Sequence, residues 1–507
     1  MDFIHNERFA SLAQAHKRPL IHTKKVPVCV IGVVKDEGGF QGFGVERLKD
    51  ASLPVFLSAG DSITLDFGCH CVGYLHYSLT HELYAITDSP AVLEFSFGEF
   101  PLELECSLDG YKGVLGNGWI QRETRSVAIT PHSHELERRY SFRYLRITRK
   151  DNAAFPLIID DLYADCVSAV DVADVPELDI PDETLKRIYD ASVRTLKECS
   201  QDVFEDGPKR DRRLWSGDLR LEALTDHVTF KNTDLVKRCI YLFAAYRYKN
   251  KFVSQCIFPD SYPYVYRYIF YDYSLFFISF LYDYLQKYDD IEFVRELYPL
   301  ALEQAELVFD VFENNYKDFC SRTFIDWCEK LDKSVSMLGL FVYTLKQLSH
   351  IGKKLLEDVR DVDEKICRVK SALLARYSEE HGLFVCESGQ ISRHSQIWAV
   401  LADVLSPDQN RRVLEKMEQA GLDIYPHTPY MMHYYIDALY SCGEKEKAMQ
   451  IIRDYWGSML DLGFDCCVEV FNPKDYFESP YKAPELNSAC HAWSCTPAYW
   501  IYRYYNE

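Results

Sequence analysis

The chain lacks any apolar segment long enough to cross a membrane. Its longest early apolar run, from Val26 to Val34, covers about half of the ~20 residues that a membrane-spanning helix needs. The first residues, MDFIHNERFASLAQ, also lack the charged start followed by an apolar stretch that is typical of a secretion signal. We therefore expect a cytoplasmic protein with no membrane partner.

An excess of positive charge is missing as well. The chain has 57 Lys and Arg against 77 Asp and Glu, so its formal net charge is −20. A field of that sign repels both a nucleic-acid backbone and anionic lipid headgroups, which argues against those partners. No Gly-rich loop of the GxGxxG or Walker type is present, so nothing in the sequence supports nucleotide use. We expect no cofactor and no nucleic-acid partner.

Paired cysteine motifs are absent, although cysteine itself is not. The 17 cysteines are odd in number and scattered, with no CxxC pair, which is typical of reduced thiols in the cytosol. The closest group is Cys69-His70-Cys71 with His76. On a strand, Cys69 and Cys71 share one face and His70 points to the other, and this spacing matches no common zinc motif. We therefore expect no metal site.

Residues 27–169 alternate between apolar and polar side chains in short segments. Examples are residues 62–67, 92–97 and 142–148, and turn residues such as Asp109-Gly110 separate such segments. Period-two alternation at this spacing predicts a β-sandwich.

The pattern changes after an acidic, proline-containing stretch at residues 174–182. A helix is predicted over 183–200, with Leu185, Ile188 and Leu196 on one face. Helical periodicity then continues to the end of the sequence. The further predicted helices cover residues 217–230, 233–247, 268–288, 290–313, 332–353, 357–377, 391–405, 407–419, 428–441, 444–461 and 490–504.

About twelve successive helices suit an (α/α)6 barrel of six helical hairpins. A solenoid would show a fixed repeat period, and none is found. We predict an N-terminal β-sandwich accessory domain, residues 1–175, followed by a helical barrel, residues 176–507. No extra module is evident, which makes a homodimer formed through the sandwich plausible.

Residues 205–218 form the densest non-helical stretch of the helical half. Charges of both signs surround Trp215, which stands close to Gly217-Asp218. Mixed charge is typical of a solvated loop, whereas a Trp is rarely placed in one. The residue types alone leave a solvated loop and a ligand site both open.

Three parts of the sequence resemble glycoside hydrolase family 78, the α-L-rhamnosidases. The first is the family's signature loop, matched by residues 206–218, which read DGPKRDRRLWSGD. The second is a pair of segments near the end, DCCVEVFNP at 465–473 and NSACHAWS at 487–494. The third lies in the β-rich region and includes residues 110–113 and 138–144. The three occur in the family's order over most of residues 60–500.

The resemblance implies an inverting glycosidase that removes terminal α-L-rhamnose from small glycosides or oligosaccharides without a cofactor. Inversion needs one carboxylic acid to protonate the leaving oxygen and one carboxylate to activate water, ~6.5–9.5 Å apart. Glu469 matches the family's general base. Because Val and Cys flank it, we expect burial to raise its pKa.

The resemblance also implies a set of sugar contacts. Carboxylates accept hydrogen bonds from sugar hydroxyls, Arg donates to them, and an aromatic face covers the apolar side of the ring. The residues that match the family's sugar-contacting positions are Asp206, Arg210, Trp215, Asp218, Trp327 (in the pair Asp326-Trp327) and His491. Tyr271-Asp272-Tyr273 is a candidate for a further aromatic wall. His427 and His433 are expected to be core or capping residues.

One departure concerns the general acid. The family has a Glu where this chain has Arg212, and an Arg, with a pKa above ~12, is no useful proton donor. We favour Asp211 as the acid, because the substitution and a one-residue deletion lie in the same loop and can compensate. Asp206 and Asp218 remain alternatives. Two other functions also remain open. One is a related hydrolase or phosphorylase that acts on an acidic or different sugar, with Arg210, Arg212 or Arg213 binding the anion. The other is a sugar-binding protein without catalysis.

Overall fold

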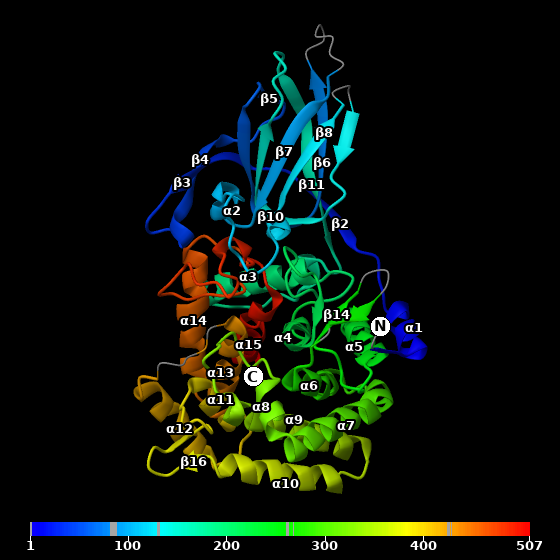
Figure 1. Ribbon diagram of the computed structural model, residues 1–507, viewed down its shortest axis with the longest axis vertical. Helices are drawn as coiled ribbons and strands as arrows, with labels where there is room; N and C mark the ends of the chain where they lie inside the picture. The colour runs from blue at the N-terminus through cyan, green and yellow to red at the C-terminus, as the bar shows by residue number, and fades with distance from the viewer. Residues whose placement is uncertain are drawn as a thin grey trace.

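The structure is a computed structural model that describes residues 3–81, 89–128, 132–259, 263–266, 268–422, 426 and 428–507. A β-rich domain, in blue and cyan, stands on a larger helical domain along the long axis of the molecule (Figure 1). The strands of the β-rich domain are β2(Ile21–Lys25), β3(Cys29–Lys35), β4(Phe43–Asp50), β5(Val55–Leu57), β6(Ser62–His81), β7(Ala91–Gly98), β8(Arg122–Val127), β9(His132–Glu135), β10(Tyr140–Arg149) and β11(Leu157–Ser168). A short helix, α2(Pro101–Glu105), follows β7.

The β-rich domain is organised around β6. This strand pairs antiparallel with both β10 and β11, within the order β2-β11-β6-β10-β7-β8. Alternate side chains of these strands, among them Phe67, Phe97 and Phe142, meet in a separate apolar core. The three segments predicted as strands lie in β6, β7 and β10, so period-two alternation located them correctly.

Helices make up most of the second domain. They are α3(Glu183–Cys199), α4(Ser216–Asp226), α5(Thr233–Ala245), α6(Tyr271–Tyr288), α7(Ile291–Asn314), α8(Tyr316–Ser321), α9(Ser334–Leu355), α10(Arg360–Leu374), α11(Arg393–Leu401), α12(Pro407–Gln419), α13(Pro429–Ser441), α14(Lys445–Asp461) and α15(Pro497–Asn506). Short 3-10 turns are η4(Pro484–Leu486) and η5(Ala492–Ser494), and short strands are β12(Leu214–Trp215), β13(Tyr246–Tyr248), β14(Cys256–Phe258), β15(Tyr264–Val265), β16(Tyr377–Ser378) and β17(Leu383–Phe384).

The inner helices of this domain form a ring. Helices α4, α6, α9, α11 and α13 contact one another in succession, and η5 contacts both α13 and α4, which closes the ring. Every residue of α4 is buried, as an inner helix requires. The site described below lies at the end of the ring that faces the β-rich domain, because α4 begins directly after residues 206–215.

Helix α3 illustrates how a capping residue and apolar spacing determine where a helix begins and which face it buries. Asp182 accepts a hydrogen bond from the backbone N–H of Leu185 at 3.0 Å and so caps the first turn. The predicted face, with Leu185, Ile188 and Leu196, is buried. The helix ends at Cys199, beneath the β-rich domain.

The first residues lie with the helical domain rather than with the strands that follow them. Strand β1(Phe3–His5) pairs with β13, and helix α1(Glu7–Ala15) packs against α5 (Figure 1). Asn6 caps α1 by accepting from the N–H of Phe9 at 3.2 Å. No helix in the described ranges has the length and apolar character that a membrane crossing requires.

Candidate functional site

Glu469 is fixed on the segment between α14 and η4 by a dense set of donors. Its side chain is 2 % exposed. The Nη2 group of Arg210 donates to both carboxylate oxygens at 2.7 Å, and the Tyr481 hydroxyl donates to Oε1. The backbone N–H of Ser488 donates to Oε2 at 3.0 Å. The carboxylate therefore has one defined orientation.

The charge state of Glu469 differs from the sequence-based expectation. Burial alone does raise its pKa, as expected. Arg210 and then His491 outweigh burial, and hydrogen bonds from Arg210 and Tyr481 add to them, so the pKa falls to about 2. The expected rise was wrong because the sequence neighbours of Glu469 do not reveal the cation that faces it.

Asp211 occupies a tight turn of the same site. Its φ is 64° and that of Arg212 is 54°, and the N–H of Arg212 donates to the carbonyl of Arg210 at 2.8 Å. Non-glycine residues rarely adopt this left-handed region, and such positions concentrate at functional sites. The turn places the Asp211 carboxylate 3.4 Å from Nη1 of Arg210 and 3.6 Å from Nη1 of Arg213.

One guanidinium group thus contacts both carboxylates of the predicted pair. Arg210 lies 2.7 Å from Glu469 and 3.4 Å from Asp211. The two nitrogens belong to one rigid planar fork, so the contacting oxygens of the two carboxylates are at most about 8.5 Å apart. Such a spacing is compatible with the ~6.5–9.5 Å of inverting glycosidases.

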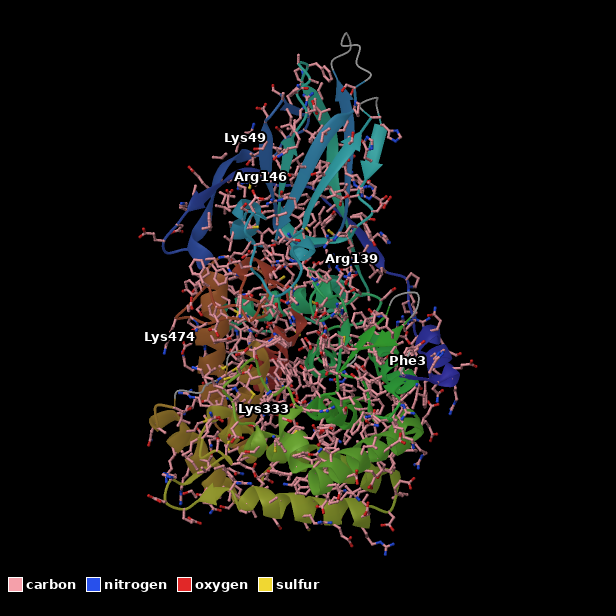
Figure 2. All side chains as sticks on the ribbon, in the orientation of Figure 1. Phe3, Lys49, Arg139, Arg146, Lys333 and Lys474 are labelled. Atoms are coloured by element: carbon pink, nitrogen blue, oxygen red, sulfur yellow. The ribbon has the colours of Figure 1, made fainter. Side chains whose placement is uncertain are left out.

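Arg212 serves as a tether between the domains. Its guanidinium donates to the carbonyl of Pro208 at 2.8 Å and to the carbonyl of Arg139, which lies at the junction of the two domains (Figure 2). Burial, followed by the charge of Arg139, lowers its pKa to about 10. Arg212 therefore holds the loop in place and stays charged at neutral pH.

Asp206 and Asp218 are more deeply buried than Asp211. Asp206 accepts from the N–H of Arg213 at 3.0 Å, and Asp218 lies in the first turn of α4. Burial raises the pKa of Asp206 well above its usual range, and Asp211 and Asp218 raise it further. Burial and then Glu469 raise the pKa of Asp218 in the same way. Both groups are therefore harder to ionise than an ordinary Asp.

Three polar atoms of the predicted sugar contacts are buried without a partner. Trp215 Nε1, Asp218 Oδ1 and His491 Nδ1 have no hydrogen-bond partner among the described residues. His491 lies between the two acids, with Nδ1 3.7 Å from Asp218 and Nε2 3.7 Å from Glu469. Burial lowers the pKa of His491 to about 4, so the ring is neutral at pH 7. Because orphaned buried polar atoms are costly, this group is prepared for a polar ligand.

Aromatic rings surround the polar group. The Trp327 ring, 42 % exposed, is 6.1 Å from that of Tyr481, which lies 4.1 Å from the Arg210 guanidinium. Trp215 stands edge-on to Tyr273 at 6.4 Å. A Cβ on Gly217 would lie 2.4 Å from the Tyr273 ring, so glycine is needed for this approach.

The structure brings the sequence-predicted residues into one region. They are Asp206, Arg210, Asp211, Trp215, Asp218, Trp327, Glu469 and His491. Contacts of Arg210, His491 and Tyr481 connect several of them, whereas Trp215 contacts Tyr273. Asp326 positions its neighbour by accepting the N–H of Trp327 at 2.9 Å. Tyr481 was not predicted, because it belongs to neither matched segment and no local pattern marks it.

The other residues singled out in the sequence lie at the edge of this site or away from it. Tyr273 joins the aromatic wall, whereas Tyr271 donates to Asp318 at 2.7 Å, away from Glu469. His433 is a buried core residue, as expected, and accepts from Trp500 at 3.1 Å. His427 lies outside the described residues.

A cleft of about 1530 Å³ opens beside the loop that carries Asp211. Helix α1, the β-rich domain and this loop form its walls. Its basic lining residues are Lys17, Arg138, Arg139, Arg212, Arg213 and Arg238, and its acidic ones are Glu7, Glu137, Asp202, Glu205 and Asp211.

Comparisons with known proteins identify the family of the chain. Residues 27–166 match the model of the glycosyl hydrolase family 78 α-rhamnosidase N-terminal domain, and residues 175–505 match that of the bacterial α-L-rhamnosidase six-hairpin glycosidase domain. The chain belongs to glycoside hydrolase family 78. The fold class predicted from the sequence, an N-terminal β-sandwich followed by an (α/α)6 six-hairpin barrel, is confirmed as a β-rich domain followed by a six-hairpin glycosidase domain. The chain is a glycosidase of the α-L-rhamnosidase type.

Solved structures of family 78 enzymes resemble this one. A rhamnosidase from Klebsiella oxytoca with rhamnose bound is 35% identical, with a TM-score of 0.94, over 99% of this chain and 100% of that chain. A family 78 rhamnosidase of Bacillus sp. GL1 is 18% identical, with a TM-score of 0.73, over 90% of this chain and 49% of that one. The α-L-rhamnosidase of Streptomyces avermitilis, complexed with L-rhamnose, is 13% identical, with a TM-score of 0.68, over 96% and 44%. These last two show the fold alone. A comparison with curated proteins gives no match.

Proposed function

We propose that this family 78 chain removes terminal α-L-rhamnose from small glycosides or oligosaccharides with inversion at the anomeric carbon. The observation that carries the proposal is the single Arg210 guanidinium between Glu469 and Asp211. It holds the contacting oxygens of the two carboxylates no more than about 8.5 Å apart, which stays below the upper end of the ~6.5–9.5 Å range of inverting glycosidases. Rhamnose bound to the 35% identical Klebsiella enzyme supports the choice of sugar.

In the proposed reaction, Glu469 accepts a proton from water while the water oxygen attacks the anomeric carbon. The bond to the leaving oxygen breaks, and Asp211 donates a proton to that oxygen. Both carboxyl groups then exchange protons with solvent and return to their starting states. The low pKa of Glu469, about 2, keeps the base ionised at neutral pH.

The orphaned atoms supply the sugar contacts in this proposal. A sugar hydroxyl can accept a hydrogen bond from Trp215 Nε1. Other hydroxyls can exchange hydrogen bonds with Asp218 and His491, as donor or as acceptor. The exposed part of the Trp327 ring covers the apolar face of the sugar. Asp206, buried beneath the loop, holds the backbone of Arg213 and supports Asp211 next to it.

Three arginines of this cleft favour a leaving group that carries negative charge, although the lining as a whole contains nearly as many acids as bases. In the described part of the chain, Arg138, Arg212 and Arg238 donate their hydrogen bonds to backbone carbonyls rather than to a carboxylate. The cleft is also lined by Asp211, which places its cations on the side of the proposed proton donor. A carboxylate on the leaving group would be attracted into this cleft.

Arg138 tests this preference with little structural risk, because it makes only a 3.4 Å hydrogen bond to the carbonyl of Gly118 and a 5.5 Å contact with the Tyr140 ring among the described residues. The substrates are two aryl α-L-rhamnosides that differ only in a para-carboxylate and its methyl ester. We expect Arg138→Gln to lower kcat/KM for the carboxylate about 5-fold relative to the ester, as loss of a charge contact would. The surface variant Arg360→Gln is the control. An unchanged ratio in Arg138→Gln would contradict an anionic leaving group.

Hydrolysis of a simple aryl α-L-rhamnoside tests the proposed function itself. Turnover that requires inorganic phosphate would favour the phosphorylase alternative, and tight rhamnose binding without turnover would favour a non-catalytic sugar-binding protein.

Three further parts of the proposal are the domain boundary, the cellular location and the oligomeric state. A domain boundary near residue 175 is supported by the end of β11 at Ser168 and the start of α3 at Glu183. A cytoplasmic location is supported by the cysteines, since all 17 are free thiols. A homodimer stays a prediction that sedimentation would test.

A further inference from the structure

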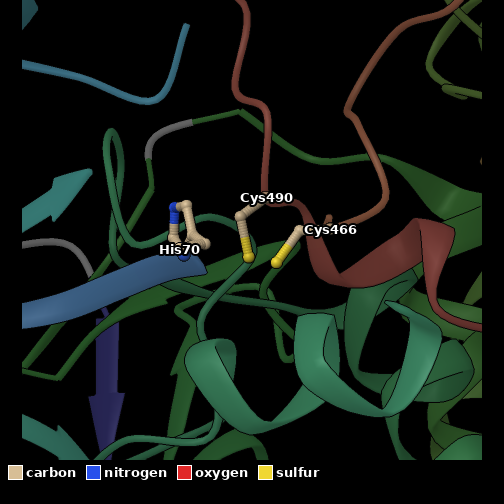
Figure 3. A group of neighbouring side chains, drawn as sticks. All are labelled: His70, Cys466 and Cys490. Atoms are coloured by element: carbon tan, nitrogen blue, oxygen red, sulfur yellow. The ribbon is translucent and has the colours of Figure 1, made fainter. Parts of the chain in front are cut away.

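Three potential metal ligands meet where the two domains join. His70 comes from β6 of the β-rich domain, whereas Cys466 and Cys490 come from the two segments that carry Glu469 and His491 (Figure 3). One ligating atom of each residue lies within 4.8 Å of the other two, and all three residues are buried. Their side chains gather at one point although they are far apart in the sequence.

The hydrogen bonds of His70 leave one ring nitrogen for a ligand. Nε2 lies 3.0 Å from Glu99 Oε1 and 3.0 Å from Ser141 Oγ. Nδ1 has no hydrogen-bond partner among the described residues, and it cannot reach solvent because His70 is only 2 % exposed. A histidine that binds a metal usually donates its other N–H to a carboxylate, and the Glu99 contact has that form.

A fourth ligand is at hand. The thiol of Cys199, at the end of α3, interacts with that of Cys490, and both are fully buried. Three cysteines with one histidine is a common ligand set of structural zinc sites. The positive charge of Arg194, which donates to the carbonyl of Asp465 at 3.1 Å, lies next to Cys466 and can offset the thiolates.

We propose that His70 Nδ1 and the thiolates of Cys199, Cys466 and Cys490 bind one Zn²⁺ ion. Ligand atoms of a tetrahedral zinc site with bonds of ~2.0–2.3 Å are about 3.5 Å apart, so the His70, Cys466 and Cys490 atoms, which lie within 4.8 Å of one another, need only small movements. Cys199 lies outside this group of three and would join it through its contact with Cys490. Binding releases the three thiol protons. No metal was expected from the sequence because the spacing around residues 69–71 matches no common zinc motif, whereas three of the four proposed ligands lie elsewhere in the chain.

The site would connect the β-rich domain to the catalytic segments. Cys490 directly precedes His491, and Cys466 stands three residues before Glu469. A bound ion would hold both segments against β6 without touching the sugar. The zinc site therefore does not depend on the identity of the substrate, and its failure would leave the proposed function intact.

The test is metal analysis of the full chain purified without chelators. We expect about one zinc per chain after dialysis, and a fall in melting temperature of at least about 5 °C once a chelator removes it. Protein stripped of zinc should bind Co²⁺ with the absorption of tetrahedral thiolate coordination. Cys466→Ser and Cys490→Ser should each lose most of the zinc, whereas Cys367→Ser, which changes an exposed thiol outside the group, should retain it.

Alkylation of the wild-type protein covers the case in which the serine variants do not fold. With zinc present, Cys466 and Cys490 should resist alkylation during mild unfolding, and after chelation they should react at least about 10-fold faster. Zinc below about 0.1 per chain with no Co²⁺ spectrum would overturn the proposal. So would a Cys466–Cys490 disulfide found in the native protein.

Discussion

Replacing Glu469 with Gln is expected to lower kcat/KM for an aryl α-L-rhamnoside about 10³-fold, within the range for loss of a general base. An amide has nearly the same shape as the carboxylate and still accepts from Arg210 or Tyr481, but it cannot take a proton from water. The aryl leaving group needs little protonation, so this substrate reports on the base rather than on the acid. Steady-state kinetics at pH 7 measure the effect.

Two further measurements separate a lost base from a damaged site. Glu415→Gln, an exposed change on α12, should retain wild-type rates. Glu469→Ala with added azide should form the β-L-rhamnosyl azide, because azide needs no deprotonation before it attacks. A Glu469→Gln rate within about 3-fold of wild type would exclude Glu469 as the base.

Replacing Asp211 with Asn should have an effect that depends on the leaving group. We expect a loss of about 10²-fold or more on a rhamnosyl disaccharide, whose sugar leaving group must be protonated. On a nitrophenyl rhamnoside we expect a loss of less than about 10-fold, because nitrophenolate leaves without a proton. The ratio of the two effects is the measurement, since a merely structural defect would lower both rates alike.

Asp206→Asn and Asp218→Asn are the matched controls for this assignment. Both acids are buried and burial raises the pKa of each, which makes them the remaining candidates for the proton donor. If they support the site and bind sugar as proposed, their replacement lowers turnover of both substrates by similar factors. A strong leaving-group dependence in either variant, together with none in Asp211→Asn, would transfer the role of general acid to that residue.

Most of the fold was predictable because its elements are long and strongly periodic. Helices α3, α7 and α14 begin and end within two residues of their predicted positions, since their apolar spacing is regular and, for α3 and α7, an Asp caps the first turn. Helix α8 was missed because six residues are too few to show a period. The pairing of β1 with β13 was not predicted either, because it depends on contacts between residues far apart in the sequence.

The site was predictable where residues belong to matched segments and not where chemistry depends on contacts across the fold. Residues 206–218, Glu469 and His491 were identified from their order and type. Tyr481 and the low pKa of Glu469 were not, because both depend on the position of Arg210 relative to a segment more than two hundred residues away. The grouping of His70 with Cys466 and Cys490 was hidden for the same reason.

The configuration of the first-formed sugar tests the account most directly. Hydrolysis of an aryl α-L-rhamnoside by the wild-type chain, followed by proton NMR before mutarotation, identifies the anomer that leaves the site. A pair of carboxylates arranged around Arg210 for direct attack by water predicts β-L-rhamnose as the first product, formed without added phosphate. Initial release of α-L-rhamnose, or no turnover of the rhamnoside, would contradict the inverting mechanism proposed for Glu469 and Asp211.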